Sequence, residues 1–295
     1  DNFVTTKSED ISFDFLVISM GAELAPEKIP GLVENGFNLY DHNQLDEIHH
    51  KLDKIESGKI AIVIMAMPYK CPPAPFEASL LVDSMLRKRG IRDSIQIDFY
   101  SPAPITLPAA GPEVSKKILD LVNSEKIIFH NSKKIIRVEP KKLIFENDEY
   151  SFDILLAIPP HTAPKVIYDS NLAKEPGFIP INRDCKTPHE NIFAVGDVTS
   201  LVVTDSMAVP KAGVFAEGEG IAVAKNIVSK LLSKEPSVLF DGKGGCFLES
   251  GRDTASTIEV DMFADPKPST RLTESTKDNL SKKLDFEKER LSKWL

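Results

Sequence analysis

The sequence has few cysteines, no excess of basic residues and no long apolar run, and each shortage excludes a class of protein. The three cysteines, at positions 71, 185 and 246, have neither the spacing of a zinc site nor the density of a disulfide-stabilised fold. The formal net charge is −8, with acids and bases interspersed, so nucleic acid is not an expected partner. Because no apolar segment approaches the roughly 18 to 20 residues of a membrane-spanning helix, any contact with a membrane is expected to be peripheral.

Glycine is missing from one turn where its absence matters. Residues 60–64 form an apolar, β-branched run, and residues 76–89 have the pattern of a helix that Gly90 ends. A strand that leads into a helix in this way often binds a dinucleotide through a glycine-rich turn, because glycine lets backbone N–H groups approach the pyrophosphate. The turn here holds Cys71, and the three prolines that follow it, at positions 72, 73 and 75, have no N–H to offer. A nicotinamide cofactor is therefore not expected to bind here in the usual way.

A cysteine in this turn has two explanations. The start of a helix favours a negative charge and can lower the pKa of a thiol from about 8.5 by one or more units, which would make Cys71 a nucleophile at neutral pH. Alternatively, Cys71 is a small buried side chain in a rigid, proline-rich turn. The residues alone do not separate these two roles.

A short internal repeat indicates the architecture. The segments 11–23 and 150–161 share Ser-Phe-Asp-x-Leu and continue into an apolar strand of the kind that is buried on both faces of a parallel sheet. Each segment follows a predicted β-hairpin, so the repeat favours two related dinucleotide-type domains, with chance similarity of two hydrophobic strands as the alternative. Further elements are expected between the repeats: a strand over 94–100, a helix over 112–122 and short strands near 126–129, 134–138 and 142–146.

The C-terminal part of the chain has a helix, a hairpin and a charged tail. The helix after Pro210 carries small residues on one face, which permit close approach to a sheet or a ligand. Residues 240–265 read as a hairpin, and residues 273–295 as a charged helix with a narrow apolar stripe. Such a stripe is typical of a helix docked on its own protein or on a partner subunit, and a contact with a lipid surface is the alternative.

The expected fold is therefore α/β, with two Rossmann-like three-layer domains, the first incomplete, followed by a C-terminal hairpin and helix. We expect the first domain to comprise residues 1–50 and 170–238, the second residues 51–169, and the C-terminal region residues 239–295. The chain begins in two hairpin strands whose neighbours are missing, so we expect a fragment without its N-terminal βαβ unit. Targeting signals are not observable in such a fragment, and the localisation is left open between soluble and peripheral.

Three motifs carry a resemblance to a known family. They are Cys71-Pro-Pro-Ala-Pro-Phe-Glu, Asn191-Ile-Phe-Ala-Val-Gly-Asp and Pro210-Lys-Ala-Gly-Val-Phe-Ala-Glu. Their order and spacing resemble the sulfide:quinone oxidoreductase and flavocytochrome c sulfide dehydrogenase family of FAD-dependent pyridine nucleotide-disulfide oxidoreductases. The resemblance covers the chain from the first repeat to about residue 265, and the Cys-Pro-Pro motif is the part most specific to the sulfide branch.

The resemblance implies an FAD site. Gly196 and Asp197 would approach the ribityl and phosphate part of FAD, with Asp197 accepting a hydrogen bond from a ribityl hydroxyl. Lys211 would lie near the flavin pyrimidine, where a cation and a helix N-terminus stabilise the negative charge of the reduced ring. A turn-capping aspartate and an ordinary surface lysine are the alternatives. The other cofactor-binding candidates are Gly21, Pro210 and Gly213.

The resemblance also implies a redox pair. The segment around Cys246 matches the position of the family's second cysteine, which nominates Cys246 as the partner of Cys71; an inert thiol in a hairpin is the alternative. Sulfide would open their disulfide and leave a persulfide on one cysteine, while the other thiolate faces the flavin. Cys185 is expected to be a bystander. Quinone-reducing members usually carry a further cysteine in the part that corresponds to residues 25–50, which is absent here and favours the two-cysteine arrangement of the flavocytochrome type.

Glu77 is the third catalytic candidate. It follows Cys71 by six residues in the first turn of the helix, where a carboxylate also stabilises the helix N-terminus. Capping and proton transfer to or from sulfide are its two predicted roles, with capping favoured.

The sequence thus predicts an enzyme, an FAD-dependent oxidoreductase that oxidises sulfide or a related sulfur compound and passes electrons to quinone or a cytochrome. An NAD(P)H-dependent disulfide or coenzyme A-disulfide reductase is the alternative enzyme, which the missing glycines disfavour. A non-catalytic, flavin-binding electron-transfer subunit is the alternative from another class. Homo-oligomer formation is left open.

Overall fold

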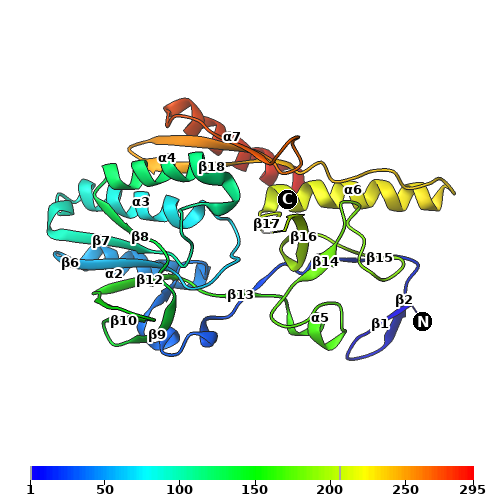
Figure 1. Ribbon diagram of the computed structural model, residues 1–295, viewed down its shortest axis with the longest axis horizontal. Coiled ribbons are helices and arrows are strands. Elements are labelled where there is room, and N and C mark those ends of the chain that lie inside the picture. Colours follow the sequence, from blue (N-terminus) through cyan, green and yellow to red (C-terminus); the bar gives the residue numbers. More distant parts are fainter. Residues whose placement is uncertain (1, 206) are drawn as a thin grey trace. The chain divides into compact units, whose positions relative to one another are not determined.

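The computed structural model describes residues 2–205 and 207–295, and the chain divides into two compact units (Figure 1). Unit 1 comprises residues 1–23, 162–244 and 261–267, and unit 2 comprises residues 24–161, 245–260 and 268–295. The chain passes from one unit to the other within β4 (Glu23–Leu24) and β13 (His161–Thr162), and again after residues 244, 260 and 267. Each unit is therefore assembled from segments that lie far apart in the sequence.

A parallel sheet forms the centre of unit 2. Its strands lie in the order β5 (Phe37–Asn38), β12 (Ile154–Ile158), β6 (Gly58–Ile64), β7 (Ile95–Tyr100) and β8 (Ile127–His130). All neighbouring strands run parallel, with Ile62 of β6 opposite Leu156 on one side and Phe99 on the other. The helices in residues 24–161 of this unit are α1 (Leu32–Asn35), α2 (Leu45–Lys54), α3 (Ala74–Lys88) and α4 (Gly111–Ser124).

Both faces of this sheet are covered, which explains the unbroken apolar run of β6. Ile60, Ile62 and Ile64 pack in one core with residues of α3 and α4. Ala61 and Val63 point the other way and pack against a small antiparallel sheet made of β9 (Ile135–Glu139), β10 (Lys142–Phe145) and β11 (Glu149–Ser151). Figure 1 shows these layers on opposite sides of the parallel strands. A strand with two buried faces has no polar alternation, and the predicted Rossmann-like α/β class is confirmed.

Helix α3 begins at Ala74, two residues before the predicted start. Pro75 is accommodated within its first turn because the first N–H groups of a helix have no partner inside the helix, so a proline there loses no hydrogen bond.

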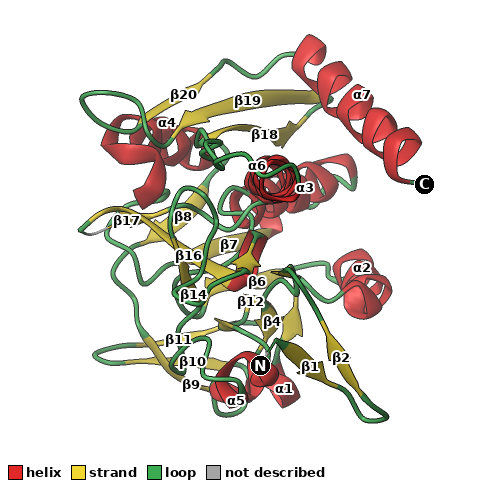
Figure 2. Cartoon of the chain, turned by 90° about the vertical axis from the view of Figure 1, so that its right-hand side faces the viewer, coloured by secondary structure: helices red, strands yellow, loops and turns green. Residues whose placement is uncertain are grey.

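The C-terminal part of unit 2 is a three-stranded sheet followed by a helix (Figure 2). The strands are β18 (Lys243–Gly251), β19 (Thr254–Asp261) and β20 (Ser269–Leu272), and β20 packs against α4. Helix α7 (Lys277–Trp294) is capped by the Thr276 hydroxyl, which accepts a hydrogen bond from the Asn279 N–H at 3.1 Å. Its predicted apolar stripe is largely exposed, with Trp294 59% exposed. No described helix combines the length and the apolar character needed to cross a membrane.

Unit 1 contains short strands and one long helix. Strand β3 (Leu16–Ile18) pairs in parallel with β15 (Ile192–Ala194). Strand β16 (Thr199–Thr204) lies between β14 (Ile179–Ile181), with which it runs parallel, and β17 (Met207–Ala208), with which it runs antiparallel. The remaining elements are the hairpin β1 (Phe3–Thr5) and β2 (Asp10–Ser12) and the helices α5 (Lys165–Asp169) and α6 (Gly213–Leu231). The short 3₁₀ helices of the chain are η1 (Pro26–Lys28), η2 (His42–Gln44), η3 (Arg92–Ser94), η4 (Pro108–Ala110) and η5 (Gly196–Val198).

The two repeated segments form different strands. All five residues of β12 are buried, as predicted, but Val17 in β3 is 41% exposed, so the prediction of a strand buried on both faces is wrong for the first repeat. The physical reason is the number of neighbours. Strand β12 lies between two strands and two packed layers, whereas β15 is the one partner of β3 among residues 2–205 and 207–295.

Candidate functional site

The turn that carries Cys71 is held by two tyrosines. The Tyr40 hydroxyl donates to the carbonyls of Lys70 and Cys71 at 2.9 and 3.3 Å, and the Tyr69 hydroxyl donates to the Pro72 carbonyl at 3.1 Å. Burial, with a contribution from Cys71, raises the pKa of both tyrosines well above the ordinary value, so both remain donors at neutral pH. Three successive carbonyls of the turn are therefore fixed. Neither tyrosine was predicted as a site residue from the sequence. The closeness of Tyr69 to Cys71 was the one sequence feature that pointed to this role.

Cys71 is exposed and has an uncommon backbone conformation. Its φ of 51° lies in the left-handed region, which non-glycine residues seldom adopt. Its carbonyl accepts a hydrogen bond from the Ala74 N–H at 2.9 Å, which turns the chain into α3. Strained residues often mark functional sites, but Cys185 also has a positive φ, of 60°, so this conformation alone does not distinguish a reactive cysteine.

Cys246 lies on β18, half-buried against the hydrophobic core of unit 2. Burial raises the pKa of Cys246 to about 12, and the charges of Cys71 and Glu77 act in the same direction. The two cysteines that the sequence nominated are therefore within electrostatic reach of each other, and both are thiols. They differ in that Cys71 is open to solvent and Cys246 is kept protonated at neutral pH.

Glu77 connects three elements near these cysteines. Its carboxylate accepts a hydrogen bond from the Glu249 backbone N–H of β18 at 2.9 Å and another from the Lys283 ammonium of α7 at 2.8 Å. Lys283 also donates to the Glu249 carboxylate at 2.8 Å. Both oxygens of Glu77 are engaged, so Glu77 links the start of α3 to β18 and α7. Lys283 and Glu249 had no signal in the sequence, because they meet Glu77 only in the folded chain.

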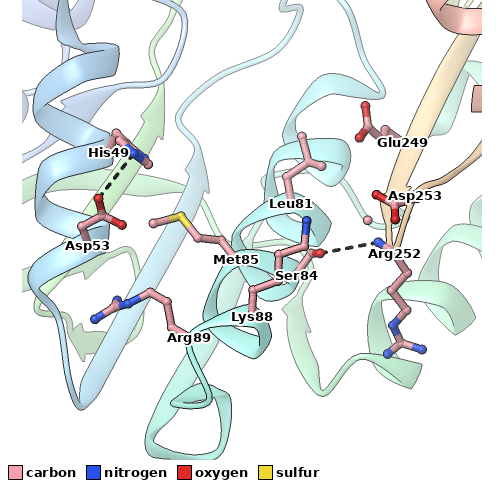
Figure 3. Close-up of a pocket in the computed structure, with 11 residues that line it drawn as sticks. His49, Asp53, Leu81, Ser84, Met85, Lys88, Arg89, Glu249, Arg252 and Asp253 are labelled. Atoms are coloured by element: carbon pink, nitrogen blue, oxygen red, sulfur yellow. Dashed lines mark hydrogen bonds and ion pairs between the residues drawn. The ribbon is translucent and has the colours of Figure 1, made fainter.

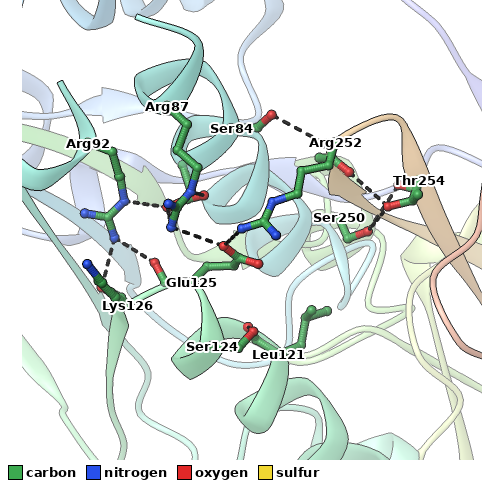
Figure 4. Close-up of polar contacts among 12 residues, drawn as sticks. Ser84, Arg87, Arg92, Leu121, Ser124, Glu125, Lys126, Ser250, Arg252 and Thr254 are labelled. Atoms are coloured by element: carbon green, nitrogen blue, oxygen red, sulfur yellow. Dashed lines mark hydrogen bonds and ion pairs between the residues drawn. The ribbon is translucent and has the colours of Figure 1, made fainter. Parts of the chain in front are cut away.

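The far end of β18 is anchored to α3 and α4 by an arginine network (Figure 4). The Glu125 carboxylate, at the end of α4, pairs with Arg252 of the hairpin turn and with Arg87 of α3, the latter at 3.2 Å. Arg87 also pairs with the buried Asp83 at 2.7 Å. Glu125 is only 12% exposed, so these pairs are partly shielded from solvent. Strand β18, which carries Cys246, is thus linked to α3 and α7 at Glu249, and to the end of α4 at Arg252 in the turn that follows the strand.

Gly251, at that turn, allows the close approach. It has a φ of 70°, and a Cβ added to it would lie 2.7 Å from the Ser84 Cβ and 3.3 Å from the Leu80 carbonyl oxygen of α3. We expect Gly251→Ala to lower the free energy of unfolding by about 1–3 kcal/mol, through the strained φ and the clash. Chemical denaturation measures this change. Gly245→Ala on the same strand is the control, because a Cβ there would meet its nearest neighbour at an ordinary 3.6 Å. Equal stability of the two variants would contradict the predicted clash.

A pocket of about 300 Å³ lies between α2, α3 and the turn after β18 (Figure 3). Acidic and basic side chains line this pocket together with the apolar side chains of Leu81 and Met85. None of the predicted site residues is among its lining residues, which are His49, Asp53, Leu81, Ser84, Met85, Lys88, Arg89, Glu249, Gly251, Arg252 and Asp253. The candidate site is therefore defined by the cysteines and their contacts rather than by this pocket.

In unit 1, a buried cluster surrounds the predicted cofactor-binding turn. The Lys211 ammonium donates to the carbonyls of Asp197 and Thr199 at 2.6 and 3.0 Å and lies 3.2 Å from the centre of the Phe178 ring. Burial lowers the pKa of Lys211 to about 8, although Asp197 and Glu219 act to raise it. Lys211 is only 7% exposed, so it is not the surface lysine that the sequence left as an alternative.

Gly196 has a φ of 76°, and a Cβ there would lie 3.1 Å from the Ala216 Cβ of α6. Its N–H donates to the carboxylate of Glu219 at 2.6 Å. Glu219 was not predicted as a site residue from the sequence. The one feature that could have indicated it is a charged residue among the small residues of α6. Of the other cofactor candidates, Gly21 lies between β3 and β4, and Pro210 precedes α6. Gly213 is the first residue of α6, and a Cβ there would meet open space.

Cys185 lies in unit 1 and is fully buried. Burial raises the pKa of its thiol well above the ordinary value, with smaller contributions from Glu219 and Asp184. A buried, protonated thiol is a poor nucleophile. These properties make Cys185 a suitable control residue for the other two cysteines.

The charge state of Glu219 gives a pH prediction. Burial raises the pKa of Glu219 to about 7 from its ordinary 4.5, although Gly196 and Lys211 act to lower it. The folded chain then binds more protons than the unfolded chain between pH 4.5 and 7, so this group makes stability fall as pH rises through that window, by on the order of 3 kcal/mol. Denaturation at several pH values measures the slope.

Glu219→Gln is expected to remove that fall, because the amide oxygen still accepts from Gly196 and has no proton to lose. Glu190→Gln, at an exposed position of the same unit, is the matched control. A wild-type slope that persists in Glu219→Gln would show that another group carries it.

No protein-family model matches this chain, but comparisons with individual known proteins find similar ones. It is 28% identical over 225 residues to the mitochondrial sulfide:quinone oxidoreductase of Dictyostelium discoideum, covering 70% of this chain and 49% of that protein. It is 27% identical to the sulfide-quinone reductase of Aquifex aeolicus, covering 90% and 64% of the two proteins. The crystal structure of the Aquifex aeolicus sulfide:quinone oxidoreductase superposes with a TM-score of 0.88 and 26% identity, covering 99% of this chain and 72% of that one. The chain thus spans about half to two thirds of the length of these curated relatives.

Proposed function

We infer the function from one premise, that this chain belongs to the sulfide:quinone oxidoreductase family, as its motifs predicted. We propose that the whole protein is an FAD-dependent enzyme that oxidises sulfide and reduces a quinone, the acceptor named in these relatives. One observation carries the proposal: the exposed thiol of Cys71 and the half-buried thiol of Cys246 lie within electrostatic reach of each other. An alternative NAD(P)H-dependent disulfide reductase is less well supported, because the turn after β6 lacks the glycines that such a cofactor needs.

The different surroundings of the two cysteines suggest their roles. In the oxidised pair, hydrosulfide attacks the sulfur of Cys71, which is the accessible one; the disulfide bond breaks, and its electron pair leaves on the sulfur of Cys246. The attacked cysteine now carries a persulfide. Because burial favours the protonated form of Cys246, the proton that arrived on hydrosulfide passes to the Cys246 thiolate. Atoms and charge balance, with one hydrosulfide consumed and one persulfide anion formed.

The tyrosines and Glu77 serve this step by holding the reactants. Tyr40 and Tyr69 fix the carbonyls on either side of Cys71, so the sulfur is presented from a rigid turn. Glu77 has both oxygens engaged, which favours a positioning role over the proton transfer that the sequence left open.

The cluster in unit 1 fits the electron-rich end of a flavin. Gly196 provides a turn without a side chain, and Lys211 provides a buried cation. The N-terminus of α6 has no side-chain cap, so its first N–H groups favour a negative charge. When bound, FAD supplies the acceptor for the two electrons that sulfide gives up. We propose that Gly196, Asp197 and Lys211 hold it, with Gly21, Pro210 and Gly213 as further binding positions.

Anaerobic titration of the whole protein with sulfide tests the proposal. Sulfide is expected to bleach the oxidised flavin band in proportion to bound FAD, and a quinone analogue is expected to restore it. Bleaching by NADH but not by sulfide would support the disulfide reductase instead. A cytochrome acceptor, a homo-oligomer and a peripheral membrane contact stay predictions.

A further inference from the structure

Helix α7 reaches the region of the two cysteines through the charged side chain of Lys283 and through one aromatic contact. Lys283 donates to Glu77 and to Glu249, each at 2.8 Å, and Glu77 is separated from Lys283 by 206 positions in the sequence. The three side chains are 21% to 29% exposed, so the cluster is partly shielded from solvent. A contact between the Phe286 and Phe247 rings, with centroids 5.6 Å apart, joins the same helix to β18.

The two carboxylates of this cluster, of Glu77 and Glu249, lie close in the sequence to the two cysteines. Glu77 follows Cys71 by six residues, and Glu249 follows Cys246 by three. The Glu249 backbone N–H also donates to Glu77. Two carboxylates that share one ammonium repel each other when the ammonium is removed. Here that repulsion would act between α3, which follows Cys71, and β18, which carries Cys246.

We propose that Lys283 is a positioning residue for the reaction at Cys71 and Cys246, through which helix α7 holds strand β18 against the start of α3. This inference rests on the proposed function, because it gives Lys283 a part in the chemistry of the same two thiols. Lys283 acts on the two cysteines through its contacts with Glu77 and Glu249.

The electrostatics of the cluster support this role. Burial acts to lower the pKa of Lys283, but its hydrogen bonds to Glu249 and Glu77 outweigh burial and raise the pKa, so the ammonium stays charged at neutral pH. Glu77 in turn raises the pKa of Cys246, as does Cys71. Loss of the Lys283 charge leaves Glu77 uncompensated, which makes the Cys246 thiol still harder to ionise.

The test compares Lys283→Met, Lys283→Arg and Lys282→Met in the whole protein. Lys282 neighbours Lys283 but pairs with Asp278 on the exposed side of α7, so it is a matched control. The first readout is disulfide formation between Cys71 and Cys246 with diamide, in which the two thiols give two electrons and two protons to the azo group. The second is the pH profile of Cys246 alkylation by iodoacetamide, followed by mass spectrometry. Neither readout requires sulfide oxidation.

Lys283→Met is expected to slow disulfide formation about tenfold and to move the Cys246 alkylation profile to higher pH. Lys283→Arg is expected to restore most of both, and Lys282→Met to change neither. Because Lys283→Met could also unfold part of the chain, the double variant Lys283→Met with Glu249→Gln is included. It removes the repulsion and is expected to recover part of the disulfide rate.

Two outcomes separate this inference from the proposed function. If Lys283→Met and Lys282→Met give the same disulfide rate and the same alkylation profile, Lys283 does not position the cysteines, whatever the activity of the enzyme. If the Lys283 variants behave as expected but sulfide never reduces the flavin, the positioning stands and the proposed function fails.

Discussion

Replacement of either Cys71 or Cys246 by serine is expected to lower sulfide-dependent flavin reduction in the whole protein by about 10³-fold or more, because the hydroxyl cannot form the disulfide or the persulfide. Cys71 is exposed, and Cys246 is half-buried at the edge of the core, so both substitutions are expected to leave the fold intact. The flavin content of the variants should therefore match the wild type. Stopped-flow absorbance under anaerobic conditions measures the loss.

Cys185→Ala is the control for this experiment. It removes a fully buried thiol from unit 1, so it is expected to cost about 1 kcal/mol of stability through the small cavity it leaves, without changing the rate of flavin reduction. A Cys246→Ser variant with an unchanged rate would refute the two-cysteine mechanism, since Cys71 would then act alone. A large loss in Cys185→Ala would show that the wrong pair had been assigned.

Replacement of Lys211 by methionine is expected to have the second-largest effect, on both the fold and the flavin. The ammonium satisfies two backbone carbonyls, of Asp197 and Thr199, and methionine keeps the apolar stem but offers them no donor. We expect the free energy of unfolding to fall by about 2–4 kcal/mol. If Lys211 lies near the reduced ring, as we propose, loss of its charge is also expected to lower the flavin potential by about 30–60 mV, equivalent to a charged hydrogen bond of about 1.5–3 kcal/mol.

Denaturation and a spectroscopic redox titration of the whole protein measure these two changes separately. Lys225→Met, at an exposed position on the same helix α6, is the matched control and is expected to change neither. A destabilised Lys211→Met protein with an unchanged potential would mean that Lys211 supports the turn at Gly196 and does not interact with the flavin.

Much of the fold was readable from local patterns. The apolar run at 60–64, the helix that Gly90 ends and the alternation of strands and helices predicted a parallel α/β sheet, because burial on both faces and the helical repeat leave periodic marks in the sequence. The same reasoning failed for the first repeat. Burial of a strand depends on its neighbours, and β3 shares its local pattern with β12 but not its surroundings.

The sequence by itself determined the candidate reactive groups of this protein: Cys71 in a turn without glycine, the Val-Gly-Asp turn and a second cysteine at position 246, because residue type fixes what a group can do. The tertiary structure decided the environment of those groups. It buried Cys246 and left Cys71 exposed, and it brought Tyr40, Glu249 and Lys283 to the site from distant segments. Hydrogen bonds and pKa shifts depend on distance and on exclusion of water, and neither is a property of a residue until the chain has folded.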